Sequence, residues 1–249
     1  MIPSSTSINS IVRNSLRRST WAFSVRKVAS TILLALAVNS YFHKKSYADD
    51  SNRLNDKQAF VLMFVDQARL YVQQEMLARI QLENIRAELE RDKIMLKHKE
   101  EAFRTGGISQ TEIEIARLKE EWSRRQLVVA EKNVDYFVAE RAAAVTLSSH
   151  FSGQPVSVSE LYELFRRAWD AACDRSPDEV AAFKAKRDYL ERSVERSRNL
   201  FLEKREPYDV LIEKEAVLES ARADYKSRLG QADKCRSEHF PTVEQISKI

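Results

Sequence analysis

The segment from Arg104 to Ala116, which reads RTGGISQTEIEIA, constrains the fold of this chain more than any other. Gly106 and Gly107 end the preceding helix, because glycine adopts the left-handed conformation that follows many helix C-termini. Ser109 and Glu112 then match a capping box, in which the serine oxygen accepts a hydrogen bond from the amide three residues later. A helix end followed so closely by a helix start predicts a helical hairpin with its tip at residues 104–112.

The segments on either side of this tip have the spacing of long helices. Residues 55–103 predict a single helix, whose second half, from Leu82 to Phe103, carries apolar residues at alternating steps of three and four, with Asp92 and Lys99 as charged interruptions. A matching seam runs from Leu127 to Ala144 in a helix expected to end near Ser148. The short connection makes the two helices antiparallel, with arms of about 60–75 Å.

Residues 151–249 predict a short helix, a second long helix and a disordered tail. The short helix spans Ser157 to about Cys173 and is amphipathic. Ser176 is the expected N-cap of the long helix, because Pro177 follows at the first helical position. That helix is expected to run to Leu229, with Gly230 as its stop.

Pro207 lies inside the predicted long helix and marks either a kink or a hairpin turn. The 3-4 register that begins at Val180 continues unbroken to Leu229, so we favour one kinked helix. A helix of that length separates Cys173 from Cys235 by about 80 Å. A disulfide between these two cysteines, the only ones in the chain, would therefore contradict the kinked helix and support a hairpin.

Composition agrees with an all-α chain. Only 4 of 249 residues are Gly and 5 are Pro, and 31% are charged. The expected fold is all-α, with a long antiparallel coiled-coil hairpin (residues 49–150) followed by the short helix and the second long kinked helix. Seams with charged core-type positions indicate a specific homo-oligomer.

Residues 1–48 have the features of a signal peptide. They contain seven Lys or Arg and no Asp or Glu, and an apolar run of about 15 residues follows Arg26-Lys27. Ser46-Tyr47-Ala48 predicts cleavage between Ala48 and Asp49. An uncleaved membrane anchor and an organelle transit peptide remain alternatives. Because the rest of the chain is slightly acidic, the positive net charge does not indicate nucleic-acid binding.

No catalytic, phosphate-binding or metal-binding motif is present in the sequence. The four histidines are scattered, and the carboxylates alternate with Lys and Arg as on solvated helix faces. We therefore expect a non-enzymatic protein without a cofactor.

The hairpin tip resembles the coiled-coil hairpin of periplasmic adaptor proteins, also called membrane fusion proteins, and the helical repeats of outer-membrane efflux channels. The resemblance covers residues 55–145. Adaptor tips often read G-small-[IV]-S-x-x-E-[LIV]-x-x-A. The residues that fill this pattern are Gly106, Gly107, Ile108, Ser109, Glu112, Ile113 and Ala116.

This resemblance implies that the tip docks onto a protein partner in a bacterial envelope. Many adaptors carry Arg and Leu eleven and seven residues before the tip serine, where this chain has His98 and Ala102. The β domains of complete adaptors have no counterpart in the sequence. We therefore expect an exported, periplasmic coiled-coil protein that is an accessory component of a transport or secretion assembly. A membrane-associated channel-like component, for which residues 59–65 would contact the membrane, and an organelle inner-membrane coiled-coil protein are the alternatives.

Overall fold

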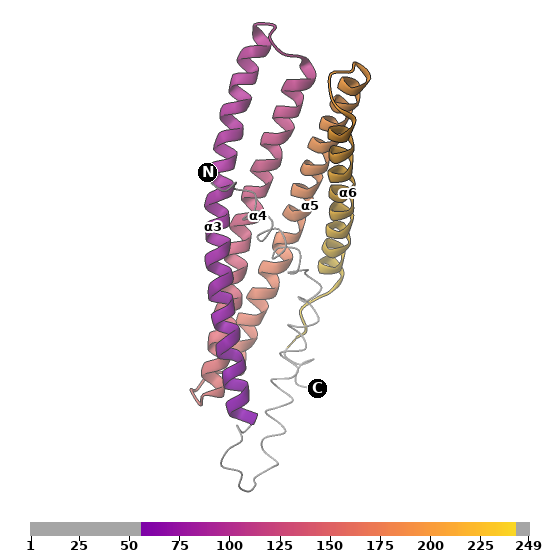
Figure 1. The fold of residues 1–249 in the computed structure, drawn as a ribbon. Helices are drawn as coiled ribbons and strands as arrows, with labels where there is room; N and C mark the ends of the chain where they lie inside the picture. Colours follow the sequence, from indigo (N-terminus) through magenta and orange to yellow (C-terminus); the bar gives the residue numbers. More distant parts are fainter. Residues whose placement is uncertain (1–55, 243–249) are drawn as a thin grey trace, which may run out of the picture. The chain divides into compact units, whose positions relative to one another are not determined.

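The computed structural model describes residues 56–242, which form four successive helices (Figure 1). They are α3 (Asp56–Arg104), α4 (Gln110–Phe151), α5 (Val158–Leu202) and α6 (Tyr208–Ser237). No strand occurs in this part of the chain, which confirms the all-α class. The successive helices pack in pairs, α3 against α4, α4 against α5 and α5 against α6. The predicted signal peptide, its cleavage site at Ala48-Asp49 and residues 243–249 of the predicted tail lie outside the described residues.

Helices α3 and α4 form the predicted hairpin, and their boundaries lie within three residues of the expected ones. The seam from Leu82 to Phe103 faces inward for most of its length, and Leu89 is buried. Asp92, one of its charged interruptions, accepts a hydrogen bond from the Ser123 hydroxyl on α4. Lys119 Nζ lies 3.4 Å from the same carboxylate. The interruption is therefore a polar contact between the two arms.

Helix α4 is buried on two stripes because it packs against both α3 and α5. Its predicted seam includes the buried residues Ala130, Val134 and Ala144. A second buried series consists of Tyr136, Glu140, Ala143 and Leu147. Sequence periodicity revealed only the first series.

The predicted break at Ser176 is wrong, because α5 runs unbroken through this position. Pro177 lies inside the helix, and Ser176 is a buried interior residue, not an N-cap. An interior proline removes one helical hydrogen bond, here to the Cys173 carbonyl, and destabilises a helix by about 3 kcal/mol. Residues on both sides of the proline, such as Trp169 and Ala182, are buried. Their packing holds the helix together, so the predicted short helix is the first part of α5.

The predicted kink at Pro207 is also wrong, because a turn at residues 203–207 separates α5 from α6. Lys204 has a φ of 58°, and the amide of Arg205 donates to the Leu200 carbonyl at 2.8 Å. These features define a left-handed helix end. Pro207 itself precedes the first residue of α6 in an extended conformation.

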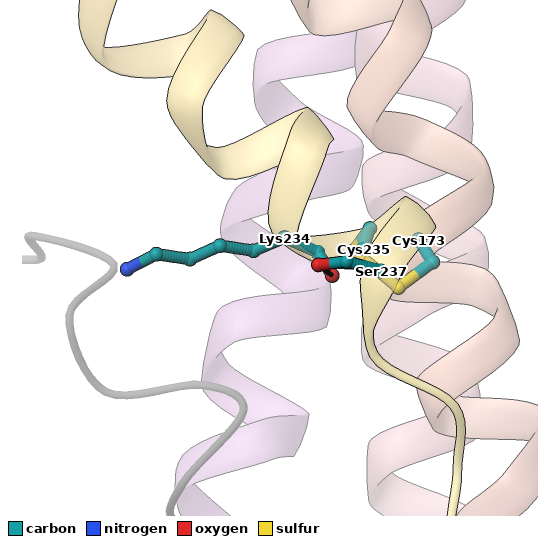
Figure 2. Close-up of a disulfide and its surroundings, with 4 residues drawn as sticks. All are labelled: Cys173, Lys234, Cys235 and Ser237. Atoms are coloured by element: carbon teal, nitrogen blue, oxygen red, sulfur yellow. Dashed lines mark hydrogen bonds between the residues drawn. A yellow bond between two sulfur atoms is a disulfide. The ribbon is translucent and has the colours of Figure 1, made fainter.

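A disulfide between Cys173 and Cys235 joins α5 to α6 at the end of their hairpin opposite the turn (Figure 2). The two Cα atoms lie 5.4 Å apart, although 62 positions separate the residues in the sequence. Lys234 points away from the bond in Figure 2. The pairing decides between the two interpretations of Pro207, in favour of the hairpin. Helix α6 also continues past Gly230 to Ser237.

Candidate interaction site at the hairpin tip

Two backbone hydrogen bonds close the end of α3 at the tip. The amide of Gly107 donates to the Ala102 carbonyl at 2.8 Å, and the amide of Gly106 donates to the Phe103 carbonyl at 3.0 Å. This pair of bonds is a Schellman motif. Gly106 has a φ of 77°, which disfavours any residue with a Cβ, and a Cβ on Gly107 would lie 3.3 Å from the Ala102 oxygen. The positive φ therefore favours glycine at position 106, and the nearby Ala102 oxygen favours glycine at position 107.

The capping box at the start of α4 is confirmed. Ser109 Oγ accepts a hydrogen bond from the Glu112 amide at 3.3 Å, and the Ser109 amide donates to Glu112 Oε2 at 3.1 Å. The hydrogen bond from the Ser109 amide lowers the pKa of Glu112 below its usual range, and the positive charge of Arg196 lowers it further. Glu112 is therefore ionised in the cap at neutral pH.

Ion pairs tie the first turn of α4 to both neighbouring helices. Glu112 pairs with Arg196 on α5. Arg192 lies on α5 one turn before Arg196, and its Nη2 atom is 2.5 Å from Glu114 Oε2. Arg117 Nη2 lies 3.3 Å from Glu100 Oε1 on α3. These contacts fix the position of the tip relative to the bundle. The two arginines were not predicted as contacts of the tip, because they lie 78 and 84 residues after their partners in the chain.

The predicted docking residues divide into an exposed group and a supporting group. Gly106, Gly107 and Ser109 are exposed, as is the neighbouring Gln110. Ile108, Glu112 and Ala116 are partly buried. Ile113, predicted as part of the docking surface, is only 2% exposed and belongs to the core. The surface available to a partner is therefore the turn and the first residues of α4.

A buried polar layer crosses the middle of the bundle and was not predicted. Glu140 on α4 is 5% exposed and accepts hydrogen bonds from Tyr71 on α3 and Tyr136 on α4. Burial raises the pKa of Glu140 above its usual range, while the two tyrosine hydrogen bonds oppose that rise. Burial also raises the pKa of both tyrosines. Tyr136 and Glu140 are one helical turn apart on α4. Because both residues are polar, the sequence pattern did not predict that they are buried in the bundle.

Arg175 extends this layer into α5. Its guanidinium lies over the Tyr136 ring, 4.8 Å from the centroid, and its Nε is 2.9 Å from Glu179 Oε1. Glu179 also pairs with Arg228 on α6, at 2.8 Å. Burial lowers the pKa of Arg175 to about 10, so the side chain remains charged at neutral pH. The layer therefore links all four helices through paired charges and aromatic contacts, an arrangement that holds the bundle together.

In residues 56–242, no cluster of His, Cys, Asp and Glu is arranged to hold a metal ion. None of the helices in the same region is long and apolar enough to cross a membrane. Comparisons of the chain with models of known protein families, with curated proteins and with solved structures found no match.

Proposed function

We propose that this protein is an exported structural and interaction protein, an accessory component of a transport or secretion assembly in a bacterial envelope. The hairpin tip is the docking element for a protein partner. The proposal depends above all on one observation: an exposed turn, Thr105 to Gln110, is held in a single geometry at the end of two long arms.

Rigidity makes the tip suitable for docking. The Schellman bonds fix Gly106 and Gly107, and the capping box fixes Ser109. The Glu112–Arg196 and Glu114–Arg192 pairs then anchor the first turn of α4 to α5. A preorganised surface loses little conformational entropy on binding, which favours affinity.

The disulfide supports export. Cys173 and Cys235 are the only cysteines of the chain, and both are used in the bond. Structural disulfides persist in oxidising compartments and are rare in the reducing cytosol. Together with the signal-like residues 1–48, the bond favours a periplasmic location.

Site-specific photocrosslinking in cells tests the docking. A photoreactive residue replaces Gln110 at the tip in one variant and Gln154 in the control. Both glutamines are exposed. Gln110 is the first residue of α4 at the tip, whereas Gln154 lies in the α4–α5 turn at the opposite end of the bundle. We expect a discrete adduct with an envelope protein from position 110 and none from position 154.

Three results would contradict the proposal. Adducts from both positions would indicate non-specific contact, and the absence of any heteromeric adduct from position 110 would leave the tip without a partner. Recovery of the chain from an organelle would contradict the envelope location. An adduct with a channel protein accompanied by tight membrane association would instead favour the channel-like alternative.

A further inference from the structure

The outer face of α3, which faces away from α4, exposes a row of large apolar side chains. The row consists of side chains that are each between 44% and 58% exposed: Met63, Leu70, Leu77, Ile80 and Ile94. The inner face of the same helix, with Phe64, Ala78 and Leu89, is buried. An exposed apolar row of this length on a water-facing helix marks an interaction surface.

The row belongs to a complete heptad seam. Alternating steps of three and four residues lead from Met63 to Ile94, and every one of the ten positions on this path is exposed. We name these ten residues the outer seam, which consists of Met63, Asp66, Leu70, Gln73, Leu77, Ile80, Asn84, Ala87, Arg91 and Ile94. It extends for about 45 Å, and its spacing is that of the a and d positions of a coiled coil.

We infer that the outer seam pairs with the outer seam of a second copy of this chain, in an antiparallel coiled coil centred between Ala78 and Arg79. In an antiparallel coiled coil, each a residue faces a d residue of the other helix. With this centre, every apolar residue of the seam faces another apolar residue. The pairs are Met63 with Ile94, Leu70 with Ala87, and Leu77 with Ile80.

The polar positions of the seam match in the same register. Asp66 of one copy faces Arg91 of the second copy, and Gln73 faces Asn84. Beside the seam, Arg69 lies close to Glu90 of the second copy. Each match occurs twice because of the two-fold symmetry. Within the single chain, Asp66 and Arg69 form an ion pair at 3.7 Å, and both side chains are 76% exposed. Replacing this exposed pair with contacts to the second copy therefore costs little free energy.

Other arrangements lose these matches. A parallel, in-register pair would place Asp66 against Asp66 and Arg91 against Arg91. Sliding the antiparallel pair by one heptad places Ile80 against Asn84 in one direction and Leu77 against Gln73 in the other. Polar residues at core positions select a register by penalising such alternatives. Charge complementarity and apolar matching therefore select one partner, one direction and one register.

The proposed dimer does not depend on the hairpin tip. It gives the homo-oligomer predicted from the sequence a surface and a register, and its test is separate from that of tip docking. If the chain dimerises but gives no adduct from the tip, only the tip-docking proposal is contradicted. If the chain is a monomer but gives an adduct from the tip, only the proposed dimer is contradicted.

Charge reversal in the full chain tests the pairing. Asp66→Arg places arginine against Arg91 of the second copy, twice per dimer, and we expect the dimer dissociation constant to rise on the order of tenfold or more. Adding Arg91→Asp restores opposite charges in the antiparallel register, so dimerisation should recover. In a parallel pair, the double variant would keep like charges together. Sedimentation measures the dissociation constants, and circular dichroism checks that each variant keeps its helices.

Cysteine pairing tests the register. Gln73→Cys and Asn84→Cys are prepared as single variants that retain the native disulfide. Position 73 lies about 16 Å along the axis from position 73 of the second copy, too far for a disulfide. We therefore expect crosslinks between the two variants when they are mixed, and none within either variant alone.

Several results would overturn the inference. Crosslinks within a single variant would show a parallel pair, and a monomer at micromolar concentration would show that the seam does not self-associate. Binding of the monomer to anionic lipid vesicles that is lost in Leu77→Gln would identify the seam as a membrane-contacting face.

Discussion

Glu112 and Arg196 form an ion pair that joins the cap of α4 to a residue 84 positions later on α5. The same carboxylate accepts the hydrogen bond from the Ser109 amide that completes the capping box. One ionised side chain therefore serves both the local helix start and a tertiary contact. The hairpin tip is consequently coupled to the α5–α6 half of the bundle.

This coupling predicts a pH dependence. Because the pKa of Glu112 is lowered in the folded state, its contribution to stability is present at neutral pH and is lost as the pH falls below about 4.5 through the folded pKa. Glu112→Gln keeps the capping pattern but removes the charge. We expect the stability difference between the native chain and this variant, measured by urea unfolding, to shrink as the pH is lowered. Glu213→Gln, at an exposed position on α6, is the control and should show no such trend.

Glu140 should show the opposite dependence. Its pKa is raised by burial, so its favourable contribution is complete below the unfolded pKa and is lost as the pH rises through the folded pKa. The native chain should therefore lose stability relative to Glu140→Gln between about pH 4.5 and neutral pH. Glu131→Gln, at an exposed position on the same helix, is the matched control. A difference that is flat or rises over this range would contradict a buried carboxylate with a raised pKa.

The disulfide should contribute strongly to stability. Closing a loop of 62 residues stabilises a fold by about 4 kcal/mol in the chain-entropy model. Replacing both cysteines, Cys173→Ser with Cys235→Ser, should lower the free energy of unfolding by roughly 2–4 kcal/mol. Urea unfolding of the native chain with and without reductant provides the comparison. If the reductant also destabilised the doubly substituted chain, the effect could not be assigned to this bond.

The two left-handed turn residues Gly106 and Lys204 should respond in opposite directions. Gly106→Ala introduces a Cβ at a φ of 77° and should destabilise the chain by about 1 kcal/mol. Lys204→Gly removes a Cβ at a φ of 58° and should stabilise it by up to about 1 kcal/mol. Thermal unfolding of both variants measures the two shifts. Equal signs would show that the backbone conformation at one of these turns differs from that described.

Features with a local cause were predicted correctly from the sequence. Gly106, Ser109 and Glu112 are close in the chain, and hydrogen bonds among neighbouring residues fix their geometry. Tertiary packing decided the rest. Ser176-Pro177 has the pattern of a helix start, but burial of the residues around it favours a continuous helix.

The heptad phase across Pro207 was misleading. Phe201 and Tyr208 are seven positions apart on opposite sides of the turn, and their rings lie 5.5 Å apart between α5 and α6. Part of the predicted register does face inward on α6, where Leu211 and Leu218 are buried. The register is not kept throughout, because Tyr208 and Leu229 are exposed and Ala221 is buried in place of Arg222. Phase alone cannot distinguish the two structures, whereas the pairing of Cys173 with Cys235 does.

The packing of successive helices from α3 to α6 chiefly against one another also favours an order of folding. Native contacts close in sequence form quickly, so each hairpin can form as soon as its second arm has been synthesised. Oxidation of Cys173 must wait until Cys235 and nearly all of α6 have emerged. The disulfide therefore forms only after α6 is nearly complete and lies against α5. Its formation is a measurable sign that α6 has packed onto the bundle.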